Sequence, residues 1–294
     1  MSPGIATPPV TNVMTVDVED YFQVSAFEAG VSRDRWGEYE SRVVANTERV
    51  LKMFAESGVQ ATFFVLGWVA DHQPRLVTQI AAAGHEIASH GYWHRLVYEM
   101  TPAEFREDLR RARTALESVT GQRVVGFRAP SYSITSRSLW ALDVLIEEGY
   151  AYDASIFPVR HDRYGIPSAP RHPHRVERNA GALLELPGST VRVAGANVPV
   201  AGGGYFRIFP YRWTRWGIRH VNGIEGMPVV FYVHPWEADP EQPRLAAPRF
   251  SRFRHYHNLH QTEYRLRRLL AEFRFGTAKS LVLGERVVAR EAAG

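Results

Sequence analysis

The sequence predicts an α/β fold built on parallel strands. Helical and extended patterns alternate along the chain, which favours βα units over separate helical and sheet domains. Acidic, histidine and arginine residues follow the apolar runs expected to be strands, and parallel barrels carry their functional loops at such positions. A length of 294 residues, with 45% hydrophobic and 22% charged residues, is typical of one large domain or two small ones.

The first half of the chain shows a regular succession of elements. The first expected strand is a β-rich run that ends with residues 15–17. From Val43 to Phe54, apolar residues recur at helical spacing, and Gly58 follows at the expected helix end. The next expected elements are a buried strand over 61–66, a helix over 74–83 ended by Gly84, and a strand over 85–89.

The later elements carry clearer start and stop signals. Thr101 and Glu104 form a capping box with Pro102 at the first helical position, which predicts a helix to about Val119. Leucines at helical spacing in the arginine-rich stretch 252–274 indicate an amphipathic helix with a solvated face, in preference to a nucleic-acid or membrane patch. The remaining expected elements are a strand over 124–127, a helix over 136–148 and a late strand over 229–233.

The composition narrows the chemistry and the location that we expect. The sequence contains no cysteine, which excludes disulfides and thiolate chemistry and leaves histidine and carboxylate as the strong metal ligands. It has no apolar run long enough to span a bilayer, and residues 1–9 do not resemble a signal peptide. We therefore expect a cytoplasmic protein, associated with a membrane only through a lipid-linked substrate. The net charge is +4, and almost all of the cationic residues are arginine. We expect no nucleic-acid partner.

Two histidines and three acids form the candidate metal site. His90 and His94 are four residues apart, a spacing that lets both imidazoles reach one ion from a helical turn. Asp17, Glu19 and Asp20 follow the first strand, where alternation places Asp17 and Glu19 on the same side. One carboxylate beside two histidines would complete a catalytic zinc set, and a second acid could then act as base. The same acids could instead form a solvated turn or an N-cap for the next segment.

Five segments in this order resemble the motifs of the polysaccharide deacetylase family, the NodB-homology carbohydrate esterases. The segments are Thr15–Asp20, Ser89–His94, Phe127–Tyr132, Tyr152–Pro158 and Val233–Pro235. The resemblance extends over about residues 12–236 and implies a distorted (β/α) barrel with fewer than eight strands, the NodB-homology fold. It also implies a metal-dependent hydrolase that removes N-acetyl groups from the amino sugars of a polysaccharide or its precursor.

The residues of several motifs resemble those of a subgroup found in the exopolysaccharide loci of bacteria that use exosortase sorting. The similarity lies in residues 17–22, 202–207 and 234–240, and in the stretch 242–282. It implies a role in bacterial exopolysaccharide biosynthesis. We expect a single catalytic domain over residues 1–294, in which residues 237–294 form a C-terminal extension packed on the barrel.

The family resemblance also implies roles for individual residues. A divalent ion, expected to be Zn²⁺, would be held by the histidine pair and one carboxylate of the first motif. Asp17 would be the general base and His234 the general acid. Arg128 is expected to pair with Asp17 and hold it ionised, and Asp153 is expected to orient His234 in the same way.

The first motif departs from the usual family pattern of two adjacent aspartates. Position 18 is Val18, so the carboxylate ligand is either Glu19 or Asp20. Alternation slightly favours Glu19, because it shares a face with Asp17. Asp20 would preserve the usual aspartate chemistry but requires the backbone to turn.

Residues beside the motifs could bind a saccharide. Trp93, Tyr132 and Trp236 could stack on the apolar face of a pyranose. Pro130, two residues before Tyr132, is a further residue expected to contact the saccharide. The backbone N–H of Tyr132 could also stabilise a tetrahedral oxyanion. The glycine run 202–204 could form a lid over the cleft or a loop with unusual backbone angles.

Two other functions are compatible with these features. A small cyclic amide could be the substrate, as in the related allantoinase-like branch, or the chain could be a non-catalytic carbohydrate-binding relative. The presence of candidate base, ligand and acid residues argues against a non-catalytic protein, and the subgroup motifs argue against a cyclic amide.

Overall fold

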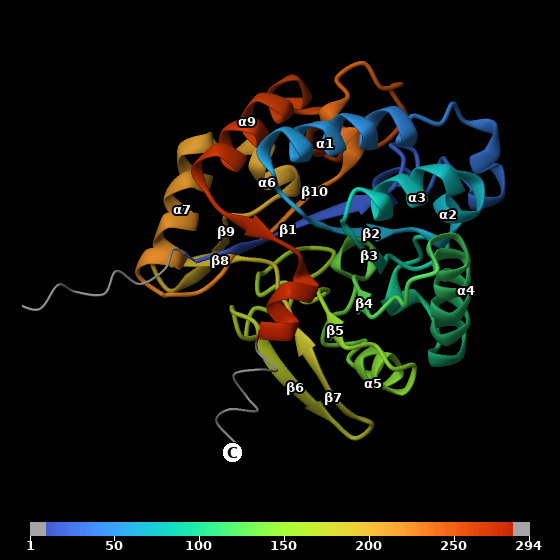
Figure 1. The fold of residues 1–294 in the computed structure, drawn as a ribbon, viewed down its shortest axis with the longest axis horizontal. Coiled ribbons are helices and arrows are strands. Elements are labelled where there is room, and N and C mark those ends of the chain that lie inside the picture. Colours follow the sequence, from blue (N-terminus) through green and yellow to red (C-terminus); the bar gives the residue numbers. More distant parts are fainter. Residues whose placement is uncertain (1–9, 285–294) are drawn as a thin grey trace, which may run out of the picture.

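A nine-stranded sheet forms the centre of the computed structural model, which describes residues 10–284 (Figure 1). Its strand order is β10-β1-β2-β3-β4-β5-β7-β6, and β11 pairs with β1 beside this path. Neighbouring strands are parallel except for the antiparallel β6–β7 hairpin. The strands are β1 Asn12–Val18, β2 Thr62–Val65, β3 Glu86–Ser89, β4 Gly126–Phe127, β5 Tyr152–Asp153, β6 His174–Arg178, β7 Gly181–Glu185, β10 Val230–Val233 and β11 Phe275–Gly276, with β8 Thr190–Val193 and β9 Ala196–Pro199 in a separate hairpin.

Helices cover the sheet and alternate with its strands, which confirms the expected α/β class. Among the residues that the structure describes, β10 and β6 lie at opposite ends of the strand order and do not pair, so the sheet remains an open, incomplete barrel. Within the same residues, no helix is long and apolar enough to cross a membrane. The helices are α1 Val43–Ser57, α2 Gly67–His72, α3 Pro74–Ala82, α4 Pro102–Thr120, α5 Trp140–Glu147, α6 Gly203–Ile208, α7 Tyr211–Gly223, α8 Arg249–Tyr256 and α9 Leu259–Glu272.

Several helix boundaries follow directly from local sequence signals. The capping box of α4 is present: Thr101 Oγ1 accepts from the N–H of Glu104, whose carboxylate accepts from the N–H of Thr101. Helix α1 ends at Gly58, whose φ of 64° lies in the left-handed region that glycine adopts without strain. These termini therefore depend on residues that were identifiable from sequence alone.

Two expected helices differ from the structure. The helix expected over 136–148 begins only at Trp140, because the Ser138 hydroxyl donates to Ser133 O and accepts from the N–H of Thr135, which stabilises a preceding turn. The helix expected over 252–274 is two helices, α8 and α9, separated at Asn258. Asn258 has a φ of 54°, which a right-handed helix does not contain, so the two helices are separate.

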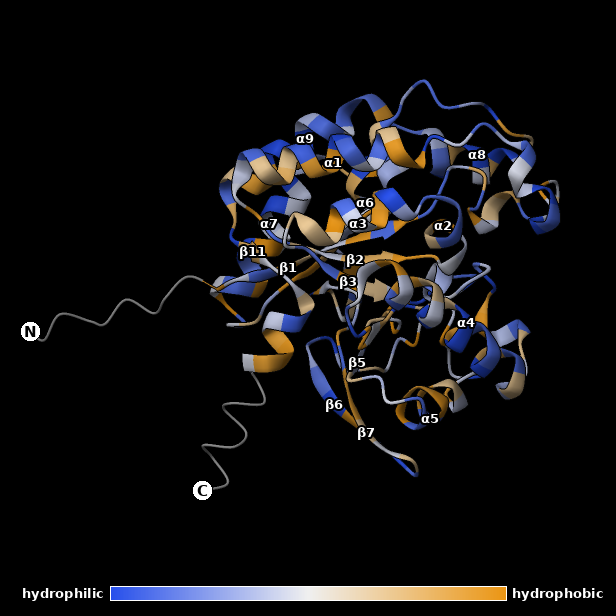
Figure 2. Ribbon diagram, turned by 45° about the vertical axis from the view of Figure 1, so that its right-hand side comes forward, coloured by the Kyte–Doolittle hydropathy of each residue, from blue (hydrophilic) through white to orange (hydrophobic). Residues whose placement is uncertain are grey.

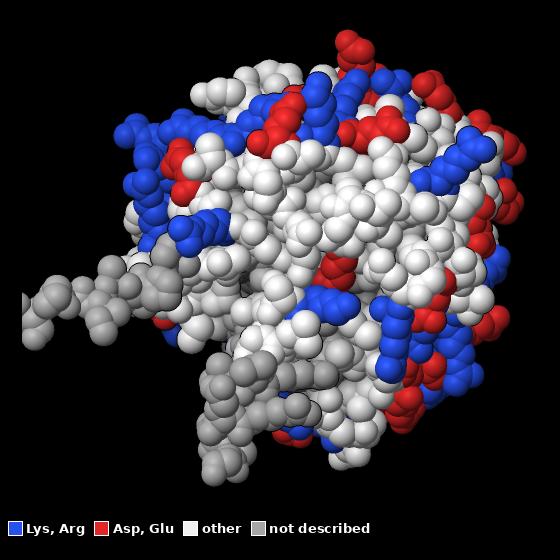
Figure 3. All heavy atoms as spheres, in the orientation of Figure 1, with Lys and Arg blue, Asp and Glu red and all other residues white. Residues whose placement is uncertain are grey.

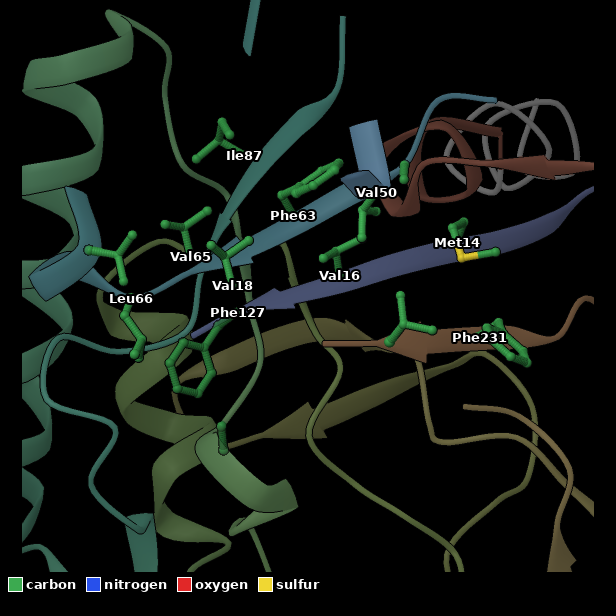
Figure 4. Close-up of a cluster of buried hydrophobic side chains, with 14 of the residues drawn as sticks. Met14, Val16, Val18, Val50, Phe63, Val65, Leu66, Ile87, Phe127 and Phe231 are labelled. Atoms are coloured by element: carbon green, nitrogen blue, oxygen red, sulfur yellow. The ribbon is translucent and has the colours of Figure 1, made fainter. Parts of the chain in front are cut away.

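The two faces of β1 have different surroundings. Met14, Val16 and Val18 join the main hydrophobic core on the side of the sheet that packs against α1 (Figure 4). Val13 belongs to a second cluster on the other side, which faces the interior of the open barrel. Asp17 lies on this interior side, because alternate residues of a strand point to the same face. The outer surfaces of α4 and α9 are mostly polar, as amphipathic helices require (Figure 2). Charged side chains of both signs gather over these helices (Figure 3).

The glycine run 202–204, which contains the N-cap and first residues of α6, packs tightly against β10. Gly202 and Gly203 have φ values of 87° and 51°. A Cβ on Gly202 would lie 2.2 Å from the carbonyl oxygen of Tyr232, so a larger residue would collide with the strand that precedes His234. Of the two roles considered for this run, the structure shows the loop with unusual backbone angles.

Candidate active site

The carboxyl ends of the parallel strands bring the polar motifs together. Asp17 lies near the end of β1, and Glu19 follows that strand. His90, Arg128 and His234 directly follow β3, β4 and β10. Because these strands run parallel, their carboxyl ends meet at one edge of the sheet and collect side chains from distant parts of the sequence.

Glu19, His90 and His94 form a buried cluster that could hold a metal ion. Each residue offers one ligand atom, and these atoms lie within 4.8 Å of one another. Glu19 Oε2 is 2.6 Å from His94 Nε2, and its Oε1 accepts a hydrogen bond from the indole N–H of Trp236. Two imidazole nitrogens and one carboxylate oxygen are a donor set that suits a catalytic divalent ion and leaves positions for water and substrate.

Hydrogen bonding and charge prepare this cluster for a cation. His90 Nδ1 lies 2.8 Å from the carbonyl oxygen of Arg128, to which it can donate, so that Nε2 is left available as a ligand. Burial lowers the pKa of His90 to about 4, which keeps the imidazole neutral near pH 7. Burial alone would raise the pKa of Glu19, but His94, His234 and His90 together hold it well below its usual range. The carboxylate is therefore ionised and the His90 ring neutral, as metal binding requires.

The histidine pair lies on a loop, which corrects the helical turn expected from its spacing. Gly91 has a φ of 75° and His94 a φ of 51°, values that no helix contains. Asp108 on α4 accepts hydrogen bonds from the N–H groups of Tyr92 and Trp93, at 2.8 and 3.3 Å. This buried carboxylate fixes the loop that carries both imidazoles, and no motif in the sequence indicated its role.

Asp20 faces away from the histidines and caps α1. Its Oδ2 accepts from Ser41 Oγ at 2.8 Å and from the N–H groups of Arg42 and Val43 at 2.9 and 3.1 Å. These bonds satisfy N–H groups at the start of α1 that have no partner within the helix. The structure thus uses Asp20 as a capping acceptor for α1, whose N-cap residue is Arg42, and places Glu19 in the cluster that could hold a metal ion.

Asp17 forms a buried ion pair with Arg128. Asp17 Oδ1 and Arg128 Nη1 are 2.7 Å apart, and both side chains are buried. The same guanidinium donates to Thr15 Oγ1 and to Ala154 O, and it lies 4.3 Å over the ring centroid of Phe64. Arg128 therefore holds Asp17 in a fixed position with its negative charge compensated, as the sequence predicted.

Glu237, and not Asp153, accompanies His234, which corrects the expected pairing. His234 Nδ1 is 2.7 Å from Glu237 Oε1, and Glu237 Oε2 accepts from Arg207 Nε at 2.5 Å. Burial would lower the pKa of His234, but Glu237 above all, with Glu19 and Asp17, raises it to about 9. The opposite ring nitrogen, Nε2, lies 3.8 Å from Asp17 Oδ2, so the candidate acid and base face each other.

Asp153 supports a neighbouring loop instead. It accepts from the Ser155 hydroxyl, which in turn accepts from the N–H of Ala129 at 2.7 Å. Burial raises the pKa of Asp153 to about 6, and that of the adjacent Glu185 lies well above its usual range for the same reason. The two carboxyl groups share this buried environment, and Asp153 positions the segment before Pro130 through Ser155.

The aromatic residues expected to bind sugar occupy different environments. The ring of Trp236 stacks between His234 and His255, at centroid distances of 5.0 and 4.1 Å. Tyr132 is buried against Tyr232 and has a φ of 54°, a strained value typical of functional turns. Trp93 is half-buried.

Pro130 is buried and begins the turn that contains Tyr132. It is therefore a packing residue of the turn in this structure.

Comparison with known proteins assigns the N-terminal part of the chain. Residues 27–149 match the family described as polysaccharide deacetylase. This match places a polysaccharide deacetylase domain at residues 27–149. Residues 154–283 match a domain of unknown function, DUF3473. The histidine pair and Arg128 lie within the deacetylase match, whereas His234 and Glu237 lie within DUF3473, so both segments contribute to the candidate site.

Curated relatives of this domain are named as deacetylases. A peptidoglycan deacetylase-like protein of Gibberella zeae is 32% identical over 130 residues, which cover 42% of this chain and 38% of that protein. A chitooligosaccharide deacetylase of Bradyrhizobium sp. is 31% identical over 110 residues, which cover 37% of this chain and 48% of that protein. The chain thus spans less than half the length of these relatives.

Solved structures share the fold over nearly the whole chain. A crystal structure from Mycobacterium smegmatis, provisionally described as a polysaccharide deacetylase, aligns with a TM-score of 0.62 at 23% identity and covers 97% of this chain and 95% of that one. PuuE allantoinase aligns with a TM-score of 0.56 at 14% identity, covering 92% of this chain and 88% of that one. These likenesses show that the chain shares its fold with these proteins over nearly its whole length.

Proposed function

We propose that this protein is a metal-dependent deacetylase that hydrolyses the N-acetyl group of an amino sugar in a saccharide. The observation that carries the proposal is the juxtaposition of a metal-binding triad, a buried carboxylate and a histidine at one end of the sheet. Amide hydrolysis needs a polarised carbonyl, a base for water and an acid for the departing amine, and these three groups can supply them. The deacetylase names of the relatives support the same substrate class.

We propose Glu19, His90 and His94 as the ligands of a divalent ion, with Zn²⁺ as the metal. When bound, such an ion polarises the acetamide oxygen and lowers the pKa of water. Asp17 and His234 lie beside this triad, because His234 Nε2 is 3.7 Å from Glu19 Oε1 and 3.8 Å from Asp17 Oδ2. Substrate and water would therefore enter between the ligands and the acid–base pair.

Asp17 is the proposed base. Its pairing with Arg128 compensates its charge in a buried position and fixes the carboxylate through one oxygen, Oδ1. The second oxygen, Oδ2, faces His234 and is free to accept the proton of the attacking water.

His234 is the proposed acid. Its Nδ1 proton is held by Glu237, which leaves Nε2 directed toward the reaction centre. A raised pKa keeps the ring protonated at neutral pH, so that it can deliver a proton to the amine as the C–N bond breaks. Tyr132 lies in the turn after Arg128, and its backbone N–H donates to the carbonyl oxygen of Ala129 at 3.1 Å. This N–H would have to leave that acceptor to stabilise the oxyanion that forms on the acetyl carbon.

The resemblance to the exopolysaccharide subgroup supports a polysaccharide or its precursor as the physiological substrate. The finding that would overturn this function is the absence of acetate release under every metal condition. The decisive assay measures acetate released from N-acetylhexosamine oligomers by the purified protein, with a chelator arm and with Zn²⁺ added back.

The assay also has a matched active-site control. Asp17→Asn should abolish acetate release while the metal content remains that of the parent, because Asp17 is not a ligand. Parent-like turnover in this variant would contradict the assignment of the base.

A further inference from the structure

A cavity of about 220 Å³ opens beside the candidate active site. Tyr232 and Trp236 belong to its lining, and their rings lie 5.8 and 5.0 Å from that of His234. The cavity therefore borders the point where the proposed acid acts. Most of its wall comes from residues 161–164, 204–208 and 251–255, which all belong to the segment matched by DUF3473.

The lining of this cavity is cationic. It includes Arg163 and Arg254, and among the described residues it contains neither aspartate nor glutamate. Arg163 is exposed and has no carboxylate within ion-pair distance in the described part of the chain. Arg254 has one such contact, at 3.5 Å to Asp162, whose side chain is 62% exposed. A contact of this length to a solvated carboxylate leaves most of the guanidinium's hydrogen-bonding capacity unused.

A third arginine of the lining, Arg207, is already occupied. It is buried, and it donates to Glu237 and to three backbone carbonyls at the end of α8. Arg207 therefore stabilises the fold, whereas Arg163 and Arg254 face the cavity. Among the described residues, Arg163 and Arg254 line the cavity and have no buried carboxylate as a partner.

Aromatic residues form another part of the wall. The hydroxyl groups of Tyr164 and Tyr205 are 3.0 Å apart, and both rings line the cavity. His161 stacks on Tyr164 at a centroid distance of 3.8 Å, which stiffens this side. Rings with polar edges suit sugar units, which present an apolar face together with hydroxyl groups.

We propose that this cavity is a subsite for an anionic sugar unit next to the N-acetylated unit that reacts. The unit carries a carboxylate or a phosphate, bound by the guanidinium groups of Arg163 and Arg254, while its ring lies against Tyr164 and Tyr205. Planar guanidinium groups bind the paired oxygens of both anions through two parallel hydrogen bonds. The inference rests on the proposed deacetylase function and gives the C-terminal segment a role in substrate selection.

The test compares two N-acetylated oligosaccharides of equal length, one neutral and one in which N-acetylglucosamine alternates with glucuronic acid. Arg163→Gln and Arg254→Gln should each raise KM for the acidic substrate by roughly tenfold, the loss expected for one charge-assisted hydrogen bond, and leave the neutral one unchanged. Arg252→Gln is the matched control, because Arg252 is exposed on the same helix and does not line the cavity. Equal effects on both substrates, or no effect on either, would overturn the subsite.

A binding measurement separates failure of the subsite from failure of the catalytic proposal. Calorimetric titration of the zinc-loaded Asp17→Asn protein uses two probes, the acidic oligosaccharide and N-acetylglucosamine 1-phosphate. Binding that weakens in the Arg163→Gln background supports the subsite even if the parent releases no acetate, and the probe that is affected identifies carboxylate or phosphate as the anion. Acetate release from both oligosaccharides with binding unaffected by either arginine would leave the deacetylase standing and refute the subsite.

Discussion

Glu237 and His234 are joined by a 2.7 Å contact that makes Glu237 the partner of the proposed acid. The two residues lie three positions apart in the turn that follows β10, and Arg207 from α6 holds the second oxygen of Glu237. Burial would raise the pKa of Glu237, but Arg207 and His234 lower it to about 2. The carboxylate is therefore charged throughout the working pH range and stabilises the protonated ring.

Replacing Glu237 by glutamine should move the alkaline limb of activity to lower pH. An acid must be protonated, so activity falls as pH rises through the pKa of His234, which the negative charge of Glu237 raises to about 9. Loss of that charge lowers this pKa, and we expect a kcat about ten- to a hundredfold lower at neutral pH. The measurement is a pH profile of kcat/KM, with the exposed Glu241→Gln as control. An alkaline limb that stays in place would contradict the pairing.

The different roles of Glu19 and Asp20 give a second prediction. Glu19→Gln should lose bound metal, because it removes one of three ligands, whereas Asp20→Asn should keep it. Asp20→Ala should instead destabilise the fold by about 1–2 kcal/mol, since α1 loses its cap. Metal content by mass spectrometry and urea unfolding distinguish the two effects. Metal loss in Asp20→Asn with retention in Glu19→Gln would reverse the assignment.

The positions of these acids show what the sequence could predict. Strand alternation correctly placed Asp17 and Glu19 on one side, because β1 is held by β10 over residues 13–16 and by β2 over residues 15–18, directly before Glu19. The capping box at Thr101 was equally predictable, because its donors and acceptors lie within four residues. Signals of this kind are local, and the sequence displays them directly.

The partner of His234 was not predictable in the same way. Asp153 occupies the expected motif, but its carboxyl group is committed to Ser155 and lies beside Glu185. Glu237 reaches the ring only because the chain enters a short turn after Pro235, and a buried arginine then fixes it. The local signal that could have indicated this pair is the capping-box spacing of His234 and Glu237 around a proline.

The ion pair between Asp17 and Arg128 gives a third prediction. Arg128→Ala should destabilise the protein by about 3–5 kcal/mol, because it leaves a buried carboxylate uncompensated. The double variant with Asp17→Asn should recover part of this loss, since it removes the unpaired charge. Urea unfolding of the single and double variants measures the coupling.

A more exposed ion pair provides the control for this measurement. Arg178 and Asp143 are 2.6 Å apart, but their side chains are 30% and 24% exposed. Arg178→Ala should therefore cost at most about 1 kcal/mol. Similar losses at both positions would show that burial of Arg128 does not govern the energy of its pair with Asp17.

The buried carboxyl pair of Asp153 and Glu185 should make stability fall at high pH. Both pKa values are raised in the folded protein, to about 6 for Asp153 and further for Glu185, so the folded state binds protons that the unfolded state has released. Stability is therefore fully present below the unfolded pKa values and is lost as pH rises through the folded ones. Glu185→Gln should flatten this decline, because its amide can donate to Asp153 without a titrating proton while its oxygen accepts from the N–H of Ile156. Unfolding free energies at acidic, neutral and alkaline pH measure the slope, and equal slopes for parent and variant would refute the titration of this pair as its cause.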